Sequence, residues 1–513
     1  MTTISSLNAG LLSALTPSAS TANSLAASAA TSADAVIGST IVTIPSPLGE
    51  APLVYTPEGT LAGAAPVISW AGSNTDAVSQ VMAGDYMSGT MSGQFYGLGS
   101  ALLDRFNTTG SNFSQSVSAT TPGGMPANGL GAQGAQGEIK LTVQTASGKS
   151  VDIELDSEDG TLSVSVNSSG SLSGTERSAL AKLATGFQQA IDGLSGTPPS
   201  LNLSGLMQYD PSVLSSVNLQ VSVTGEGSNN ISANVALNSK TKSVNLTDSA
   251  GTINLSLDTG SDSAILGSTA QQNQAVASYL KQFDSADAEG HGNTALMSLF
   301  KDAFTQLNST DGASTQQLPG TAYAPWLAQA DQSMLTGLPD FTASITDTTV
   351  SSNPLLPDQT DSFSYQVSQS TQLQGDAEAG SITQTQQSLL KASFHTSLSG
   401  GPVDLTPATS SQTYDYDQVD DAESSTVSLA TEEGKLLSAS LSQSSSKTTT
   451  VSEYVRGVLM SNTTTPDNTS SSQDLLSLLK PFLADDEAEQ NSGGWQQALS
   501  RLHSMILLGS NSN

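Results

Sequence analysis

Apolar residues alternate with polar residues in several stretches of the chain, which is the pattern of a strand with one buried face. Ile139, Leu141 and Val143 alternate with polar neighbours, and the same pattern returns at 151–155 and 162–166. The turn-forming triplets SGK and EDG separate the three runs. The pattern therefore predicts three antiparallel strands that share one buried apolar face.

Two further regions also favour strands. Alternating runs between residues 216 and 258 predict a meander of short strands. Strand patterns return from Asp340 to Leu459, where the EEG triplet at 432–434 is typical of a hairpin turn. The polar positions of this last region are mostly Ser, Thr and Gln, so we expect an exposed face covered with hydroxyl groups.

Helical spacing separates these strand regions. A first apolar stripe is formed by Phe95, Leu98, Leu102 and Phe106. A helix is expected over 174–194, where Ser173 and Glu176 have the spacing of a capping box. Its apolar stripe predicts that this helix lies across the sheet.

The fold class expected from these patterns is α+β, with β-rich antiparallel meanders, packed amphipathic helices and a low-complexity N-terminus. The sequence leaves open whether the two strand-rich regions share one sheet. The expected segments are a largely disordered leader at 1–70, a helical segment with a Gly-rich linker at 71–137, a β-meander with the inserted helix at 138–260, a helical segment at 264–336, a Ser/Thr-rich β region at 337–460 and C-terminal helices at 470–513.

Composition and charge exclude several classes of protein. The chain of 513 residues has 15 Lys plus Arg against 46 Asp plus Glu, a formal net charge of -31. Without a basic cluster it cannot neutralise a run of phosphates, which argues against nucleic acid and anionic membranes as partners. The absence of cysteine excludes disulfides and thiolate metal sites. No apolar run is long enough to predict a transmembrane helix.

The N-terminal residues predict an unusual route of export. The first basic residue is Arg105, so the start of the chain lacks the charged region of an ordinary signal peptide. Residues 1–45 are rich in Ser, Ala and Thr, with Ile4, Leu7 and Leu11 at helical spacing. Such a leader is similar to that of flagellar-type export substrates, and it is also compatible with a low-complexity tail. The expectation is an extracellular or cell-surface location by a Sec-independent route, with a cytoplasmic location as the alternative.

Two stretches resemble a family of uncharacterised proteobacterial proteins. They are GLGSALLDRFNTTGSNFSQSV at 97–117 and the β-meander and helix at 138–194, where Gly170, Leu172 and Glu176 fit a G-x-L-x-x-x-E pattern. The Phe-Phe-x-Gly-Asp stretch that follows this helix in the family is missing here. The resemblance implies a domain of unknown function in an exported, surface or flagellum-associated setting. It carries no catalytic residues.

The sharpest candidate for chemistry is the loop SLDTGSDSAIL at 256–266. Asp258, Thr259 and Gly260 after an apolar strand resemble the aspartic-peptidase loop, in which two carboxylates share a proton and activate water. The chain has no second Asp-Thr/Ser-Gly, so this hypothesis requires a homodimer. The competing interpretation is a strand that ends in a polar turn.

Other motifs are weaker. Carboxylates cluster at 152–159, 415–421 and 485–489, which makes a calcium-ordered module a third hypothesis. None of these runs has the spacing of an EF-hand loop. The isolated candidates are His291, His395 and His503 as metal ligands, and Trp70, Trp326 and Trp495 as recognition anchors. Ser388-Leu-Leu-Lys391 matches Ser-x-x-Lys, but it is expected inside a helix.

These observations predict a non-enzymatic bacterial protein, exported or surface-associated, that acts by contact through Ser/Thr-faced sheets. Its expected partner is a protein or a cell surface, with no cofactor and no metal. The alternative is an aspartic-type peptidase that acts as a homodimer through Asp258, Thr259 and Gly260.

Overall fold

The structure is a computed structural model, and it describes residues 67–120, 136–224, 230–260, 265–309, 327, 329–376, 378–478 and 493–509. The chain divides into the units Met1–Ala64 and Ala65–Asn513. All described residues belong to the second unit, and most of the expected leader at 1–70 lies outside them. The linker at 121–135 and the acidic run at 485–489 also lie outside.

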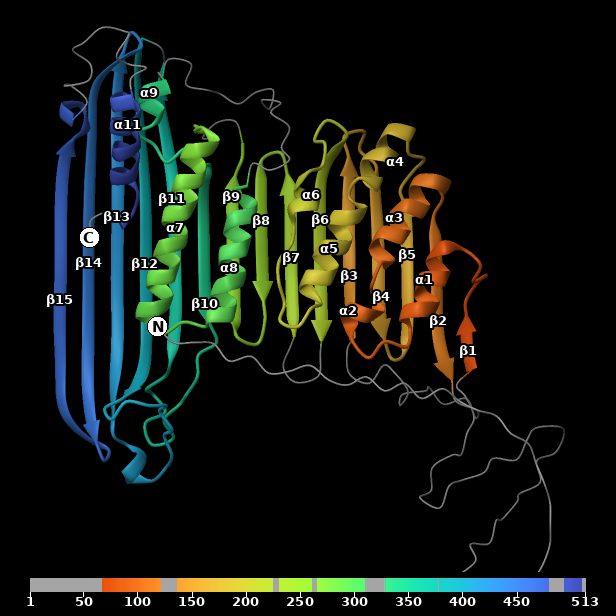
Figure 1. Cartoon of the computed structure of the whole chain (residues 1–513), viewed down its shortest axis with the longest axis horizontal. Coiled ribbons are helices and arrows are strands. Elements are labelled where there is room, and N and C mark those ends of the chain that lie inside the picture. Colours follow the sequence, from red (N-terminus) through yellow and green to blue (C-terminus); the bar gives the residue numbers. More distant parts are fainter. Residues whose placement is uncertain are drawn as a thin grey trace, which may run out of the picture. The chain divides into compact units, whose positions relative to one another are not determined.

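The described strands form one antiparallel sheet of fifteen strands, in the order β1-β2-β5-β4-β3-β6 and then in sequence order to β15 (Figure 1). The two strand-rich regions therefore share one sheet, in which β9 pairs with β10 along its whole length. The strands are β1 Val67–Trp70, β2 Phe113–Thr120, β3 Gln136–Thr145, β4 Ser150–Glu158, β5 Thr161–Ser168, β6 Leu214–Thr224, β7 Ile231–Asn238, β8 Thr241–Thr247, β9 Gly251–Asp258, β10 Asp340–Asp347, β11 Ser362–Gly375, β12 Ala379–Ser397, β13 Tyr414–Glu432, β14 Lys435–Val455 and β15 Val458–Asp474.

Helices lie along one side of this sheet (Figure 1). They are α1 Ala77–Asp85, α2 Met91–Gln94, α3 Leu98–Thr109, α4 Gly174–Ala181, α5 Ala184–Leu194, α6 Ser204–Met207, α7 Thr269–Gly290, α8 Thr294–Leu307, α9 Gln329–Gln332 and α11 Gly493–Ile506. The helix α3 packs on β4 and β5, α8 on β9 and β10, α7 on β12 and α11 on β13. None of the described helices has the length and apolar character needed to cross a membrane.

The α+β, β-rich class expected from the sequence is confirmed. The capping box is also present, because Glu176 N–H donates to Ser173 Oγ and the Glu176 carboxylate accepts from Ser173 N–H. The hairpin at 432–434 joins β13 to β14, with positive φ angles at Glu433 (49°) and Gly434 (73°).

The core lies between the sheet and the helices. Alternate strand residues such as Ile139, Leu155 and Leu257 are fully buried, as their spacing predicts. Under α7 and α8 the core is aromatic: Tyr279 meets Phe341 edge to face at 5.1 Å, and Phe283 meets Phe304 at the same distance. Edge-to-face ring pairs of this kind stabilise a core beyond the area they bury.

Several local expectations differ from the structure. Ser388-Leu-Leu-Lys391, expected in a helix, lies inside β12, because its alternating polar neighbours extend the strand on both sides. Val67–Trp70, expected in the leader, forms β1, and 113–120, expected in the helical segment, forms β2. The strand β15 runs on to Asp474, into a range expected to be helical. The helix expected over 174–194 is divided into α4 and α5.

Candidate functional site

The side of the sheet opposite the helices presents polar side chains in long rows. We call this surface the polar face; it consists of the strand residues that alternate with the buried ones. Because neighbouring strands are in register, residues of one row lie side by side across the sheet. One row contains Asn218, Ala236, Ser243, Ser256, Thr342, Ser368, Gln387, Ser424, Ser444 and Ser470.

The next row along the strands has the same character. It contains Gln220, Asn234, Asn245, Asn254, Ser344, Gln366, Leu389, Ala422, Ser446 and Asn468. Hydroxyl and amide groups of neighbouring strands also bond to each other, as Ser446 Oγ does to Asn468 Oδ1 at 2.7 Å. From β6 to β15 these two rows contain no charged residue, so their recognition chemistry is that of neutral hydrogen-bonding groups.

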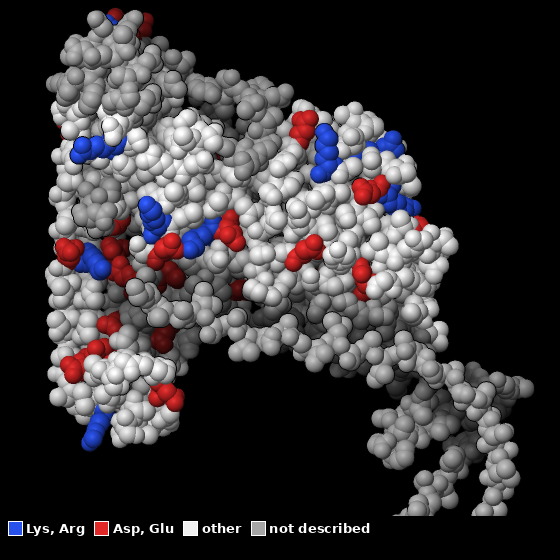
Figure 2. All heavy atoms as spheres, in the orientation of Figure 1, with Lys and Arg blue, Asp and Glu red and all other residues white. Residues whose placement is uncertain are grey.

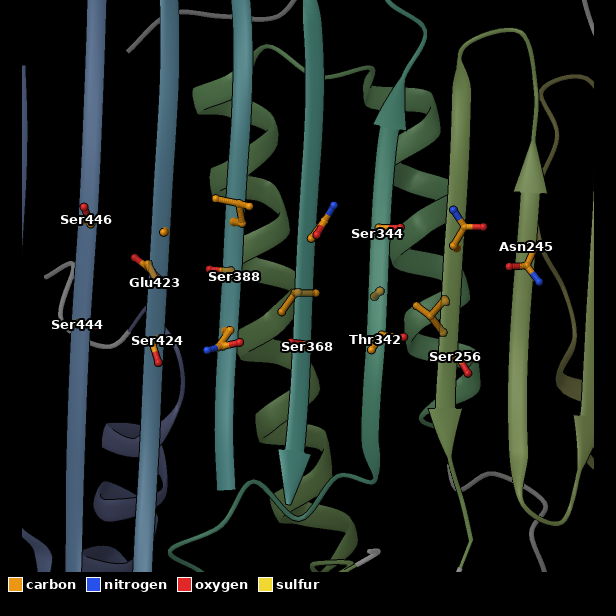
Figure 3. A pocket seen from close by; sticks show the side chains of 18 residues that line it. Asn245, Ser256, Thr342, Ser344, Ser368, Ser388, Glu423, Ser424, Ser444 and Ser446 are labelled. Carbon is orange, nitrogen blue, oxygen red and sulfur yellow. The ribbon is translucent and has the colours of Figure 1, made fainter. Parts of the chain in front are cut away.

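The polar face is hollowed where β8 to β14 cross it. The hollow has a volume of about 730 Å³ and is lined by residues of both rows, including Asn245, Ser256, Ser344 and Ser424 (Figure 3). In this view the helices lie behind the strands, so the hollow opens away from the helical layer. Many of the lining side chains are small, such as Ser256, Ser344, Ala422 and Ser444, and they leave space that longer side chains would fill.

Charged groups lie at the margin of the hollow. Lys391 and Asp420 form an exposed ion pair at 2.6 Å, in the row next to Leu389 and Ala422.

Glu423 and Ser388 face each other on the alternate, helix-side positions of β13 and β12. Burial, with the nearby carboxylates of Asp421 and Glu289, raises the pKa of Glu423. Glu423 therefore lies on the opposite side of the sheet from the hydroxyl of Ser424 and cannot act on it as a base.

Charged side chains occur on both sides of the sheet. Figure 2 shows Lys, Arg, Asp and Glu side chains spread over the helix side, and Lys301 of α8 pairs with Asp284 of α7 at 2.5 Å. Within the polar face, acidic residues are concentrated on β3 and β4, at Glu138, Glu154 and Asp156. Burial raises the pKa of Glu154, and the adjacent Glu138 adds to this increase.

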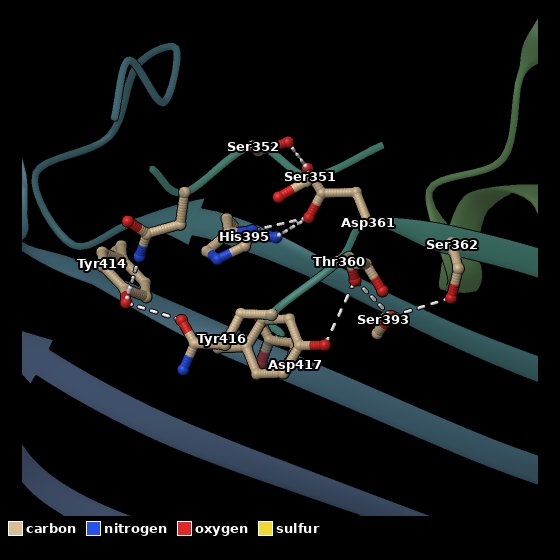
Figure 4. Close-up of polar contacts among 12 residues, drawn as sticks. Ser351, Ser352, Thr360, Asp361, Ser362, Ser393, His395, Tyr414, Tyr416 and Asp417 are labelled. Atoms are coloured by element: carbon tan, nitrogen blue, oxygen red, sulfur yellow. Dashed lines mark hydrogen bonds and ion pairs between the residues drawn. The ribbon is translucent and has the colours of Figure 1, made fainter. Parts of the chain in front are cut away.

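A second polar cluster lies where the segment 348–361 covers one end of the polar face (Figure 4). His395 Nδ1 lies 2.6 Å from Asp361 Oδ1, and the histidine side chain is 1% exposed. Ser393 Oγ donates to Thr360 O at 2.6 Å, and Tyr416 donates to the same carbonyl. These contacts attach the segment to β12 and β13.

The charge at Asp361 depends on these contacts. Burial raises the pKa of Asp361, but hydrogen bonds from His395 and Ser352 more than offset this effect and hold the pKa below its ordinary value. The Ser352 hydroxyl donates to the other carboxylate oxygen of Asp361. Asp361 therefore stays ionised and acts as the acceptor that joins the segment to His395.

This Asp-His pair is not arranged as a hydrolytic triad. In a triad the histidine stands between the carboxylate and the serine. Here Ser352 bonds to the carboxylate directly, and His395 Nε2 is buried without a hydrogen-bond partner among the described residues. The ring packs instead against Tyr414 and Tyr416, with centroids 4.9 Å away in each case.

The Asp258 loop ends strand β9 as a polar turn. Gly260 N–H donates to Asp258 Oδ1 at 2.8 Å, and Thr259 N–H donates to Lys240 O at the same distance. Across the β9–β10 pair, Asp258 lies opposite Asp340. Both oxygens of Asp340 already accept hydrogen bonds from Thr371, at 2.6 and 2.7 Å, so this facing pair is unlike two equivalent carboxylates that share a proton. Residues 261–264 of the loop lie outside the described part.

The remaining candidates are separated in the structure. His291 stacks on Phe394 with ring centroids 4.0 Å apart, and His503 is buried with Nε2 near Thr336 O at 3.2 Å. Within the described ranges, no three His, Asp or Glu side chains are grouped so as to hold a metal ion. Trp70 is half-buried against the core, whereas Trp326 and the side chain of Trp495 lie outside the described residues.

Comparison of the chain with models of protein families, with curated proteins and with solved structures found no match. The support for the candidate site therefore comes from its geometry alone. Sequence patterning predicted the Ser/Thr face, but it did not find the Asp361–His395 contact. The two residues are 34 positions apart, and the only available signal was a histidine at a polar position of a strand.

Proposed function

We propose that this chain is a non-enzymatic bacterial protein, exported or surface-associated, that acts by contact through the polar face. The observation that carries the proposal is the pair of neutral rows, which cross the sheet from β6 to β15 without a covering helix. Neutral hydroxyl and amide groups bind by hydrogen bonds and do not supply a base or an activated nucleophile.

Composition and charge support the surface setting. A chain with a net charge of -31 is repelled by polyanions, and a face of neutral groups offers no specific attraction to a polycation. The partner that fits is a neutral, polar surface of a protein or of the cell. The resemblance at 97–117 and 138–194 also agrees with an exported or flagellum-associated setting.

The contact face can be tested with charge substitutions matched in number. We would compare the pair Ser256→Arg and Ser368→Arg, in the hollow, with the pair Asn107→Arg and Asn273→Arg, at exposed positions of α3 and α7. The measurement is the fraction of purified protein that sediments with cells or envelope fragments of its host. The proposal expects binding that the first pair abolishes and the second pair retains, and equal binding by both pairs would refute it.

The setting needs a separate experiment. An internal tag in the 121–137 linker can be followed by immunoblot in culture supernatant, sheared surface filaments, periplasm and cytosol, with and without residues 2–40. Tag in the supernatant or filaments that disappears on truncation supports export directed by the leader. Tag confined to the cytosol contradicts the surface setting.

The aspartic-peptidase alternative remains a hypothesis. Among the described residues, the feature in its favour is that Asp258 and Asp340 face each other across β9 and β10. It predicts proteolysis with an acid optimum that is lost in Asp258→Ala.

A further inference from the structure

The last strand of the sheet is exposed on both of its faces. Every residue of β15 from Val458 to Ser470 is solvent-exposed, including Val458 at 61%, Leu459 at 50% and Met460 at 61%. Figure 1 shows β15 at the end of the sheet, and β14 is its only partner strand in the described part of the chain. The free side of an edge strand presents a row of backbone N–H and C=O groups that readily pair with another chain. Proteins therefore seldom leave a long edge strand uncovered.

The edge has few of the features that prevent pairing. Proteins block edge strands with lysines, prolines, bulges or short length. The strand β15 has 17 residues, no Lys or Arg, and a single proline at Pro466. A register shift in the β14–β15 pair occurs only near the hairpin, between Glu453 and Tyr454. Pro466 has no backbone N–H, so the strand offers one donor fewer than its length would allow.

We propose that β15 pairs antiparallel with β15 of a second copy of this chain, about a two-fold axis perpendicular to the sheet. The β15 strand of a second copy has the same 17 residues and can pair along the whole edge. The other edge of the sheet, β1, has 4 residues and could cover only a fraction of β15. A two-fold contact uses the same surface on both copies and closes without further growth.

The charges of β15 are compatible with this pairing. Its only charged residues are Asp467 and Asp474. In a two-fold antiparallel pair the numbers of facing residues have a constant sum, so each acid faces a neutral residue unless Asp467 or Asp474 itself lies on the axis. Like charges directly opposite each other destabilise a strand pair, and almost every register avoids them here.

The pairing would extend the polar face. Facing residues of an antiparallel pair point to the same side of the sheet, so a residue on a perpendicular axis faces its own copy. The helices of both copies would then lie on one side, and the neutral rows would continue across the junction on the other. This inference does not depend on the proposed function, because it concerns the edge and not the ligand of the face.

Mass measurement tests the dimer directly. Light scattering on the purified full chain should give a molar mass of twice the 52.2 kDa of one chain. The variant that tests the pairing places Glu at the two positions that flank the axis found by the cysteine scan below, for example Asn462→Glu and Thr464→Glu for an axis at Thr463. Those carboxylates then face each other across the junction, and the pair should raise the Kd for self-association at least about tenfold. The matched pair Asn245→Glu and Ser368→Glu carries the same charge in the middle of the sheet and should leave the dimer intact. A wild-type monomer, or equal loss of dimer in both variants, overturns the proposal.

Cysteine scanning tests the symmetry. The chain has no cysteine, so single substitutions at each position of β15 from Val458 to Asp474 give an unambiguous signal. Only the position on a perpendicular two-fold axis faces itself, so disulfide-linked dimer should peak at one residue and fall on both sides. Uniform cross-linking along the strand indicates random collision, and no cross-linking at any position excludes the axis; each result overturns the proposal. Circular dichroism and melting temperature confirm that the variants fold.

Discussion

Replacing Glu176 by Gln should loosen the start of α4. The carboxylate accepts from Ser173 N–H at 2.7 Å, from Ser147 Oγ at 2.5 Å and from Lys149 Nζ at 3.2 Å. Glutamine preserves the shape but turns one acceptor oxygen into a donor and removes the ion pair. At least one of the three donors then loses its acceptor in a site where Glu176 is 6% exposed.

The pKa of Glu176 gives the size of the effect. The hydrogen bonds from Ser147 and from the Ser173 backbone lower this pKa from 4.5 to about 2. A shift of one pKa unit corresponds to about 1.4 kcal/mol, so ionisation contributes at most about 3 kcal/mol at pH 7. Because the folded pKa lies below the unfolded pKa, this contribution is complete above pH 4.5 and is lost as the pH falls through 2. At pH 3 about 1 kcal/mol should remain.

Amide hydrogen exchange is the appropriate assay, since a chain of this size need not unfold in one step. If Gln keeps part of the cap, a loss of about 2 kcal/mol gives about 30-fold faster exchange in α4 at pH 7. The difference from wild type should shrink at pH 3. Asp104→Asn, an exposed acid on α3, is the charge-matched control and should change nothing in α4. Equal protection of wild type and Glu176→Gln at pH 7, or an equal effect at both pH values, would refute this reasoning.

Two other predictions concern buried or facing carboxylates. Burial raises the pKa of Asp85 and of Asp347 to about 6, so the folded state binds protons more tightly and the free energy of unfolding should rise as the pH falls from 7 to 4. The double variant Asp85→Asn and Asp347→Asn should show a smaller gain in melting temperature between pH 7 and pH 5, and an unchanged gain would contradict the assignment. For the peptidase hypothesis, purified protein should digest an unfolded substrate at acid pH and lose this activity in Asp258→Ala; inactivity of the wild-type chain rejects that hypothesis.

Local features could be predicted from the sequence wherever a short pattern determines the structure. The alternation around Ile139 and Leu141 marks a buried strand face, and the Ser173 and Glu176 pair marks a helix start, because each is decided by neighbours within a few residues. The Ser/Thr character of the polar face follows from the same alternation. These predictions needed no knowledge of the tertiary fold.

Long-range features could not be predicted in this way. The joining of the two strand regions depends on the pairing of β9 with β10, which are separated by α7 and α8 in the chain. Ser388-Leu-Leu-Lys391 has no local preference strong enough to exclude a helix, and pairing with β11 and β13 on both sides decides its conformation. The contact between Asp361 and His395 likewise exists only once β12 is in register with β11.

The neutral rows also explain why a chain so rich in Ser and Thr has only 12% charged residues. Neighbouring strands lie about 4.8 Å apart, so side chains of one row are in contact, and like charges directly opposite each other are destabilising. The cost is visible on β3 and β4, where burial and the adjacent Glu138 raise the pKa of Glu154. Hydroxyl and amide groups avoid this repulsion and bond to each other, as Thr450 and Thr464 do at 3.0 Å. A sheet of fifteen strands with one uncovered face can therefore remain polar across its width only if that face is mostly neutral.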